Sequence, residues 1–285
     1  MTAIGLRGRS VLILFVSVGL GFASVAGADR KAAPICVRAA TEFRIPFPEG
    51  YTRAQMIARV ATDAAIARCE LRRAHAPANV ALSSSAYAQA SRSAPMPCFG
   101  RGRRANLEGF LFPSTYLFDA RTVGQNLVAN QFAAFCSVWS RLDLTYASSK
   151  NLTPYDVLKI ASMVEAEAGT PGDRPKIAAV IYNRLRAGIP LGIDATLRYG
   201  LQIPPTESIT TAELASNSPY NTRKRYGLPP TPIDNPGVAS LEAAADPSRL
   251  GYLYFVRIPG TKQSAFFESS TAYFAYLKKH HYGPH

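Results

Sequence analysis

The sequence has few acidic residues and a clear excess of basic ones. Its 285 residues include 19 aspartates and glutamates against 32 lysines and arginines, so the formal net charge is +13 with the 4 histidines neutral. This balance disfavours a cationic partner and favours an anionic polymer or surface. No nucleic-acid-binding motif with its characteristic spacing is present, so we expect no nucleic acid partner.

Cysteine is scarce, and its spacing excludes the common metal sites. The chain has Cys36, Cys69, Cys98 and Cys136, with no CxxC pair and no cluster of histidines beside them. We therefore expect neither a metal nor another cofactor. Outside the cytoplasm an even number of cysteines predicts one or two disulfides. Four cysteines allow three pairings, and the sequence leaves the choice among them open.

Charge is absent from the segment that follows the first residues. Arg7 and Arg9 precede an uncharged run, Ser10–Ala28, and no acidic residue occurs before Asp29. Basic residues ahead of an apolar run keep that end in the cytoplasm. Residues 1–28 are then either a signal peptide, cleaved near Ala28 to give a secreted protein, or an anchor that crosses a membrane once. In both cases the rest of the chain lies outside the cytoplasm.

Hydrophobic residues are abundant, at 47% of the chain, which excludes global disorder and allows a sizeable core. Short strand patterns alternate with helix patterns, so we predict an α+β fold. Phe43–Ile45 is typical of a strand, Pro48–Gly50 of a turn, and the segment up to Leu71 of a helix capped by Thr52. Residues 76–105, rich in Ser, Ala, Pro and Arg, indicate a flexible exposed segment.

Aromatic residues concentrate in Asn106–Phe118, NLEGFLFPSTYLF. Pro113 argues against a continuous helix, so we expect a strand or a kinked loop. Alternating aromatics favour core packing, although aromatic rings can also stack on sugars. Val123–Leu142 then predicts a helix.

A helical hairpin is predicted for the middle of the chain. Thr153 caps its first helix, with Pro154 at the first position, and Gly169 can end that helix in a left-handed conformation. A second helix runs from Asp173, its expected cap, to Gly188.

Two glutamates border the apolar stripe of the first helix. Glu165 and Glu167 lie about 160° apart around the helix axis, so they cannot easily share one cleft. Partial desolvation would raise the pKa of Glu165 and let it act as a general acid. Alternatively, both glutamates are ordinary surface residues of an amphipathic helix.

The last third of the sequence combines a long loop with short regular elements. Ser216–Gly237 is broken by seven prolines and glycines, and such a long loop in a compact domain is usually functional. A helix at Val238–Ala245, strands at Gly251–Arg257 and Ser264–Glu268, and a helix at Thr271–Lys279 complete the pattern.

Several blocks of the sequence together resemble one family. LEGFLFPSTYLF, IASMVEAEAG, IAAVIYNRLRAGIPLGIDATLRYG, SPYNTRKRYGLPPTPIDNPG and SLEAAADPSRLGYLYFVR are similar, in this order over residues 107–279, to the YceG-like (MltG) endolytic murein transglycosylases. IPFPEGYTRAQMIARVA resembles the LysM-like module that precedes the catalytic part in that family. The resemblance implies a LysM-like module at residues 29–75 and a catalytic domain at residues 106–285, with a helical hairpin and a small sheet.

The resemblance also implies an activity and a site. Glu165 matches the family's catalytic glutamate, which protonates the bond between N-acetylmuramic acid and N-acetylglucosamine. It then accepts the proton of the muramoyl 6-hydroxyl, so that a 1,6-anhydromuramoyl end forms. Asp194, Tyr220, Asn221 and Thr222 lie in matching motifs and are expected to position the substrate.

The implied role is in cell-wall synthesis and remodelling. The expected partners are peptidoglycan glycan strands and peptidoglycan synthases, with membrane contact through the N-terminal segment and the catalytic domain on the periplasmic side. Three alternatives stay open: a hydrolytic muramidase, an inactive peptidoglycan-binding scaffold, and a basic protein that binds anionic polymers generally.

Overall fold

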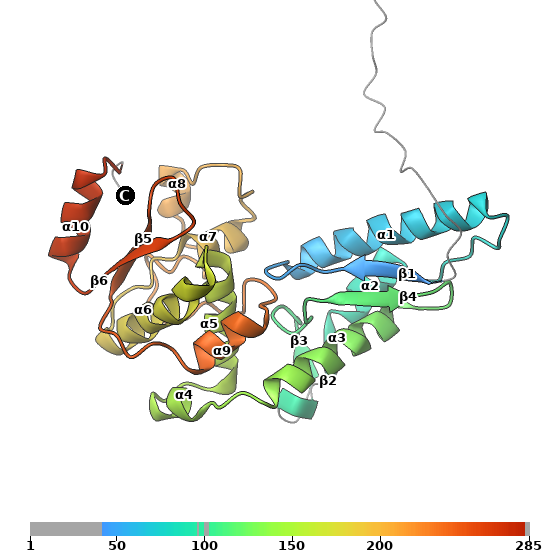
Figure 1. Ribbon diagram of the computed structural model, residues 1–285, viewed down its shortest axis with the longest axis horizontal. Coiled ribbons are helices and arrows are strands. Elements are labelled where there is room, and N and C mark those ends of the chain that lie inside the picture. Colours follow the sequence, from blue (N-terminus) through green and yellow to red (C-terminus); the bar gives the residue numbers. More distant parts are fainter. Residues whose placement is uncertain (1–41, 96, 100–102, 283–285) are drawn as a thin grey trace, which may run out of the picture. The chain divides into compact units, whose positions relative to one another are not determined.

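The structure is a computed structural model that describes residues 42–95, 97–99 and 103–282 (Figure 1). The described residues belong to one compact unit, Cys36–His285. The predicted signal peptide or anchor at residues 1–28 lies outside the described residues, as does Cys36. Within the described ranges, no helix has both the length and the apolar character that crossing a bilayer requires.

Helices and two-stranded sheets make up an α+β fold, as the sequence predicted. The helices are α1 Arg53–Arg73, α2 Ser84–Ala90, α3 Gly124–Trp139, α4 Thr145–Ser149, α5 Pro154–Glu167, α6 Arg174–Ala187, α7 Asp194–Leu201, α8 Thr211–Leu214, α9 Val238–Ala245 and α10 Ser270–Lys279, with short 3-10 turns η1 Pro97–Phe99 and η2 Pro171–Asp173. The strands are β1 Phe43–Pro46, β2 Ser93–Pro95, β3 Arg103–Ala105, β4 Thr115–Phe118, β5 Tyr254–Arg257 and β6 Ser264–Phe267.

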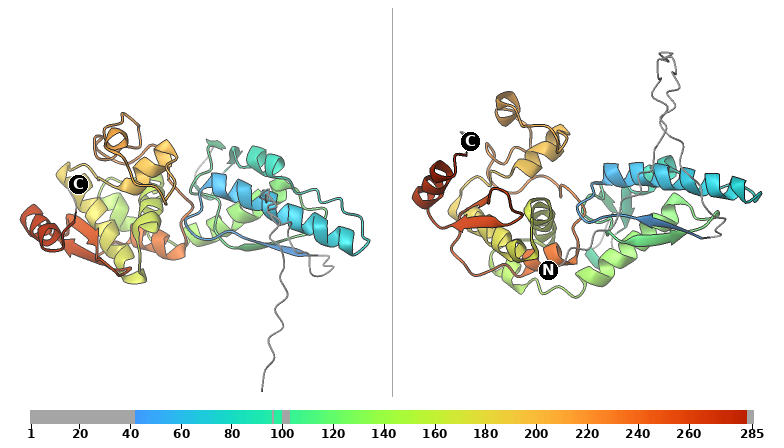
Figure 2. Two further views of the ribbon diagram at one scale, coloured as in Figure 1. Left: turned by 90° about the horizontal axis from the view of Figure 1, so that it is seen from above. Right: turned by 45° about the horizontal axis from the view of Figure 1, so that its top comes forward.

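The first strand pairs with a strand more than 60 residues later. β1 and β4 are antiparallel, with Phe43 opposite Phe118 and Ile45 opposite Tyr116, and these four side chains are buried. α1 packs along this pair (Figures 1 and 2). The Thr52 side chain caps α1 by accepting from the Gln55 N–H, as predicted. Because β4 follows residue 106, the sheet crosses the boundary that the sequence suggested between two domains.

Residues 76–105 are more regular than their composition suggested. The described part contains α2, the antiparallel pair β2–β3 and the turn η1. Tyr87 of α2 is fully buried, and its hydroxyl donates to Gln131 of α3 at 2.8 Å. A disulfide joins Cys98 to Cys136 of α3. Composition alone did not indicate these buried side chains or this covalent bond, and the flexibility of the segment stays a prediction.

The aromatic block packs in the core. Phe110 and Phe118 are buried, and Phe110 lies within about 6 Å, ring centre to centre, of Phe99, Phe135 and Tyr155. The packing interpretation of the alternating aromatics is thus confirmed for these residues.

α5 lies at the centre of the second half of the chain, in contact with α6, α7 and α9 (Figure 1). It is buried on most of its surface from Val157 to Val164. Its N-terminus has the predicted capping box, in which Thr153 and Asp156 bond reciprocally. α6 ends as predicted at Gly188, which has a left-handed conformation with φ 63°.

Two predicted details of the hairpin are wrong. Ala168 ends α5 in an extended conformation (φ −72°, ψ 118°), and Gly169 does not adopt positive φ. Asp173 precedes α6 without capping it, since its carboxylate accepts instead from the Ser264 N–H at 3.2 Å. In both cases the hairpin of β5 and β6 supplies partners that the local sequence does not reveal.

The C-terminal third follows the sequence closely. Residues 216–237 contain no helix or strand, α9 has the predicted bounds, and β5 pairs with β6 in an antiparallel hairpin. α10 covers the final helix pattern. α7 was not predicted, because Pro190 and Gly192 just before it indicated a loop.

Candidate active site

Glu165 lies in the last turn of α5 with its carboxylate held by two donors. Oε2 accepts from the Gly237 N–H at 3.1 Å, and Oε1 accepts from Arg174 at 3.4 Å. Gly237 is the N-cap residue of α9, so the positive end of a helix dipole also faces the carboxylate. The Glu165 side chain is only 8% exposed. It is therefore not an ordinary surface glutamate, and its two oxygens have a fixed orientation.

The turn before α1 lies directly against Glu165. Gly50 has φ +76°. If Gly50 had a Cβ atom, this atom would lie 3.6 Å from Glu165 Cγ and 3.8 Å from Asp234 Oδ2. The Glu49 side chain lies against Gly237, so close that a Cβ at that glycine would overlap its carboxyl group. Three carboxyl groups from distant parts of the sequence thus gather around the start of α9.

For two of these groups, Glu49 and Asp234, protonation is shifted toward the neutral form. Burial, and then the charge of Glu165, raises the pKa of the Glu49 carboxyl. Burial raises the pKa of Asp234 well above its ordinary value, and the charges of Glu165 and Glu108 add to this. Asp234 is 3% exposed, and its Oδ1 has no hydrogen-bond partner in the described structure. The site therefore contains a buried carboxyl whose surroundings favour its protonated form.

Asn235 ties the turn to the site. Its side-chain amide donates to the Tyr51 carbonyl and to Glu108, both at 2.8 Å, and its side-chain oxygen accepts from the Leu111 N–H at 2.9 Å. Two backbone bonds, Gly50 N–H to Asn235 O and Asn235 N–H to Tyr51 O, add to this link. Asn235 is fully buried, so its bonds fix three separate segments around one point.

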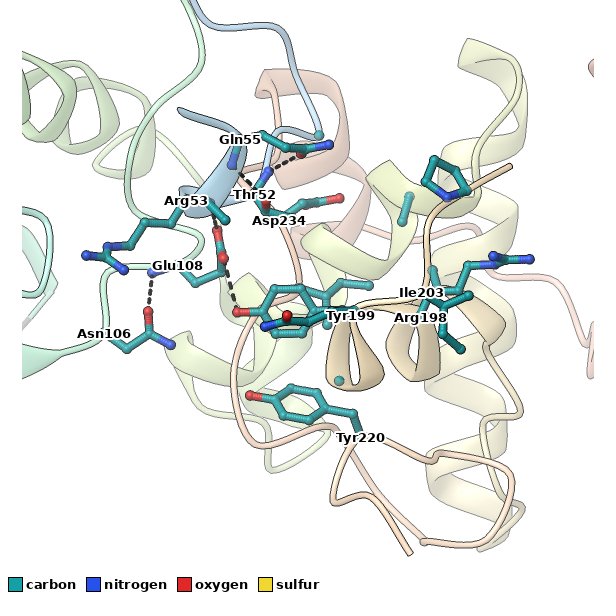
Figure 3. Close-up of a pocket in the computed structure, with 18 of the residues that line it drawn as sticks. Thr52, Arg53, Gln55, Asn106, Glu108, Arg198, Tyr199, Ile203, Tyr220 and Asp234 are labelled. Atoms are coloured by element: carbon teal, nitrogen blue, oxygen red, sulfur yellow. Dashed lines mark hydrogen bonds between the residues drawn. The ribbon is translucent and has the colours of Figure 1, made fainter. Parts of the chain in front are cut away.

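Glu108 is a further buried carboxyl beside this link. It accepts from the Arg53 backbone N–H at 2.8 Å and from the Tyr199 hydroxyl at 3.0 Å, as well as from Asn235. Burial raises its pKa to about 7 despite these three donors. Figure 3 shows Glu108 between Arg53 and Tyr199.

A cavity of about 900 Å³ opens beside Glu165. The wall includes three neighbours of Glu165: Ala166, which is next in sequence, and Gly50 and Asp234, which are close in space. Glu165 itself does not belong to the wall. The remaining wall combines apolar residues with polar and basic ones (Figure 3). The polar and basic residues include Arg53, Gln55, Arg92, Asn106, Glu108, Arg198, Tyr199, Gln202 and Tyr220.

Tyr220 alone among the four predicted substrate-positioning residues lines this cavity. Its hydroxyl shares a hydrogen bond with Thr231 at 2.8 Å, and its ring meets the edge of Tyr199, centre to centre at 5.2 Å. The two rings offer an aromatic surface of the kind that stacks on sugars.

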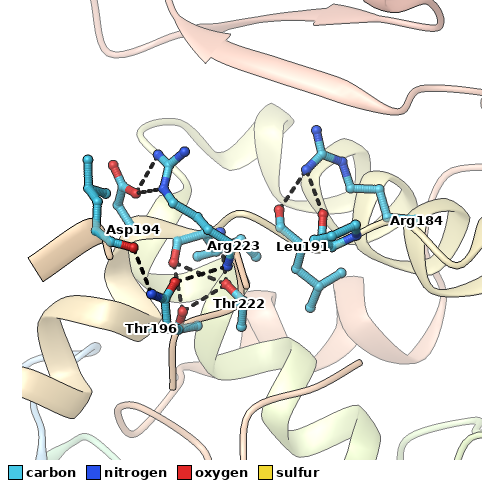
Figure 4. A network of polar contacts seen from close by, with 10 residues as sticks. Arg184, Leu191, Asp194, Thr196, Thr222 and Arg223 are labelled. Carbon is cyan, nitrogen blue, oxygen red and sulfur yellow. Dashed lines mark hydrogen bonds and ion pairs between the residues drawn. The ribbon is translucent and has the colours of Figure 1, made fainter. Parts of the chain in front are cut away.

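The other three bond to their own chain, and Figure 4 shows Asp194 and Thr222 among them. Asp194 pairs with Arg223 at 2.7 Å, and the side-chain amide of Asn221 donates to the carbonyls of Leu214 and Ser216. Thr222 accepts from the Ile193 N–H at 3.0 Å. Asn221 and Thr222 are at most 2% exposed and hold the loop, and neither belongs to the cavity wall. Their contact with substrate stays a prediction.

Glu167 points toward α7 and away from Glu165. Burial, and then the charge of Asp194, raises its pKa to about 6, and the Ala195 N–H donates to it. The divergence of the two glutamates that helix geometry predicted is therefore confirmed.

Sequence reasoning missed Glu49, Glu108, Arg174 and Asp234. Asp234 and Glu49 occur in segments that were noted, the long loop and the Pro48–Gly50 turn, but nothing local shows that their carboxyl groups meet. Only a signal for contacts between distant segments could have found them.

The comparison with known families decides the relationship. The model of the YceG-like family matches residues 29–280. This chain belongs to the YceG-like family. The resemblance seen in its sequence motifs is thus confirmed over most of its length.

Curated relatives match a smaller part of the chain. It is 37% identical over 168 residues to an endolytic murein transglycosylase of Streptococcus pneumoniae strain R6, which is 56% of this chain and 30% of the relative. It is 34% identical over 158 residues to the endolytic murein transglycosylase of Bacillus subtilis strain 168, which is 55% of this chain and 44% of the relative. The chain therefore spans less than half the length of these curated relatives.

A solved structure within the family has the same fold. The crystal structure of a YceG-like protein from Listeria monocytogenes matches with a TM-score of 0.67 and 26% identity, covering 82% of this chain and 75% of that one.

Proposed function

We propose that this chain is an endolytic lytic transglycosylase, a lyase that cuts the glycan strands of peptidoglycan. One observation carries the proposal: Glu165 has its carboxylate fixed by Arg174 and the Gly237 N–H beside a cavity of about 900 Å³. The curated relatives named endolytic murein transglycosylase support the substrate class.

The geometry suits one carboxyl acting twice. Protonated Glu165 donates its proton to the glycosidic oxygen as the bond from that oxygen to the anomeric carbon of N-acetylmuramic acid breaks. The carboxylate then accepts the proton of the 6-hydroxyl, whose oxygen bonds to the same carbon and closes the 1,6-anhydro ring. Arg174 and the Gly237 N–H stabilise the carboxylate between the two transfers. The initial protonation of Glu165 stays a prediction.

Hydrolysis is the second candidate, and Asp234 is the observation that favours it. A muramidase needs a second carboxyl near the acid, to activate water or to attack the sugar. The separation of Glu165 from Glu167 spoke against such a pair, but Asp234 supplies a second carboxyl from another segment. If Asp234 is ionised when substrate binds, it can take a proton from water, and the product then has a reducing end.

Product analysis tests both candidates. Purified glycan strands are digested, and the ends are identified by mass spectrometry as anhydromuramoyl or reducing. Glu165→Gln should lower the rate at least about a hundredfold, since it removes the transferable proton. If Asp234 directs water, Asp234→Asn shifts the products from reducing to anhydro ends. Full wall remodelling with Glu165→Gln would instead indicate a binding scaffold.

We further propose that the segment up to residue 75 acts as a LysM-like wall-binding module and that residues 10–28 anchor the chain in the inner membrane, with the catalytic part in the periplasm. The strand, turn and helix of Phe43–Arg73 support the module, and the arginines before an uncharged run support the anchor. Fractionation of cells tests the anchor, because a secreted protein cleaved near Ala28 would leave the membrane fraction. Co-purification tests the expected peptidoglycan synthases as partners.

A further inference from the structure

The cavity beside Glu165 carries more positive than negative charge. Arg53, Arg92 and Arg198 reach its wall from three different segments. The opposing acids are Glu108 and Asp234. Burial raises the pKa of both carboxyls, that of Glu108 to about 7, so at neutral pH they offset the arginines only in part.

Two of these arginines are held in place by the protein. Arg53 donates from Nε to the carbonyl and hydroxyl of Ser91, both at 2.9 Å. Arg198 donates from Nη1 to the carbonyls of Pro204 and Glu207 at 2.8 and 2.9 Å. All these acceptors are neutral, and no carboxylate among the described residues forms an ion pair with either guanidinium. Glu108 and Glu213 interact with the charges of Arg53 and Arg198, respectively, from a longer distance.

Arg92 differs because its side chain is exposed and makes no interaction within the described residues. It is therefore free to bind a ligand in the cavity. With the two fixed arginines it forms a wall that matches carboxylates, which bind guanidinium groups through paired hydrogen bonds.

The location of the cavity suggests which carboxylates it meets. It begins at Gly50, Ala166 and Asp234, next to the residue that we place at the cleaved bond. N-acetylmuramic acid, the sugar whose anomeric carbon reacts there, carries a lactyl group that is extended by an acidic peptide. We propose that this cavity binds the acidic peptide attached to N-acetylmuramic acid, with Arg92 and Arg198 contacting its carboxylates. This proposal rests on the proposed function, and it adds that tight binding of the substrate requires the peptide.

Binding without cleavage gives the direct test. In full-length protein with Glu165→Gln, calorimetry measures the Kd of a soluble disaccharide with its peptide and of the same disaccharide without it. We expect the peptide to tighten binding at least about tenfold. Arg92→Gln should weaken binding of the peptide form about three- to tenfold and leave the peptide-free form unchanged. Arg198→Gln should do the same, but it also removes the bonds to Pro204 and Glu207, so its melting temperature is compared first.

Arg121→Gln is the matched control, because Arg121 is exposed and lies outside the cavity. The proposal is overturned if the protein binds the two disaccharides with equal affinity. It is also overturned if Arg92→Gln weakens the binding of both disaccharides equally. Inorganic phosphate that competes as well as the free peptide would indicate a general anion site and overturn it too. The proposed function is judged separately, by cleavage of peptide-free strands by the unmodified protein, so either can fail alone.

Discussion

Gly50 is the single residue that allows the turn before α1 to approach Glu165. Its φ of +76° is in the left-handed region, where a side chain is strained, and Pro48–Gly50 places the turn against the carboxyls of Glu165 and Asp234. At this scale, the site depends on backbone conformation as much as on its acids, because the Gly50 N–H and Tyr51 carbonyl bond to Asn235.

Gly50→Ala should therefore reduce both stability and activity. Left-handed φ with a Cβ costs about 1 kcal/mol, and a small shift of the turn should lower the cleavage rate roughly tenfold. Gly227 is the matched control, since its φ is +85° but no atom lies within 4 Å of a Cβ there. Thermal melts of both variants should agree, whereas only Gly50→Ala should lose activity. An equal loss of activity in both would contradict this role for Gly50.

At the scale of elements, the end of α5 is set by the hairpin of β5 and β6. Arg257 of β5 donates to the Glu167 carbonyl at 2.8 Å and to the Lys262 carbonyl at 2.7 Å. We call this pair of hydrogen bonds the Arg257 clamp. It passes so close to Gly169 that a Cβ atom at this position would lie 1.6 Å from the Arg257 guanidinium and 2.0 Å from the Lys262 carbonyl. Gly169 is thus required for close approach, and the clamp fixes the turn of α5 that carries Glu165.

Gly169→Ala should break this clamp. We expect the free energy of unfolding to fall by about 1–3 kcal/mol, because a backbone carbonyl must move to make room. Urea denaturation measures the change. Gly172→Ala, in the same loop with no atom within 4 Å, should leave stability nearly unchanged and serves as the control. If the two variants have the same midpoint, the clamp does not matter for stability.

At the scale of the whole molecule, covalent and polar links join segments that are far apart in sequence. The disulfide between Cys98 and Cys136 spans 38 residues and brings η1 against α3, where Phe99 packs on Trp139 and Phe110. Cys69 is also disulfide-bonded, in agreement with the expectation of one or two disulfides. Such links suit a protein outside the cytoplasm, which is the location that we propose for this part of the chain.

Replacing Cys98 and Cys136 together by alanine should destabilise the protein. Loss of a disulfide that closes a loop of this length lowers the free energy of unfolding by about 2–4 kcal/mol. Urea denaturation without reductant measures this loss of stability, because the disulfide of Cys69 then stays intact in both proteins. An unchanged midpoint would show that the aromatic cluster holds η1 without the covalent bond.

The sequence alone determined many of the local elements and indicated the family. Thr52 and Thr153 cap their helices, Gly188 ends α6, and helical spacing separates Glu165 from Glu167, because these features depend on residues only a few positions apart. The motifs that carry the family resemblance are also contiguous, and they are sufficient to single out Glu165 as the candidate acid.

Only the tertiary structure decided what surrounds Glu165. Asp234 and Glu49 lie near it although they are 69 and 116 residues away in sequence. Arg257 donates to the Glu167 carbonyl at the end of α5, from a position 90 residues later. Asn221 and Thr222, which matched a family motif, are buried in the loop that they stabilise. The physical reason is that a carboxyl's neighbours and burial follow from contacts between distant segments, which periodicity, capping and turn chemistry do not encode.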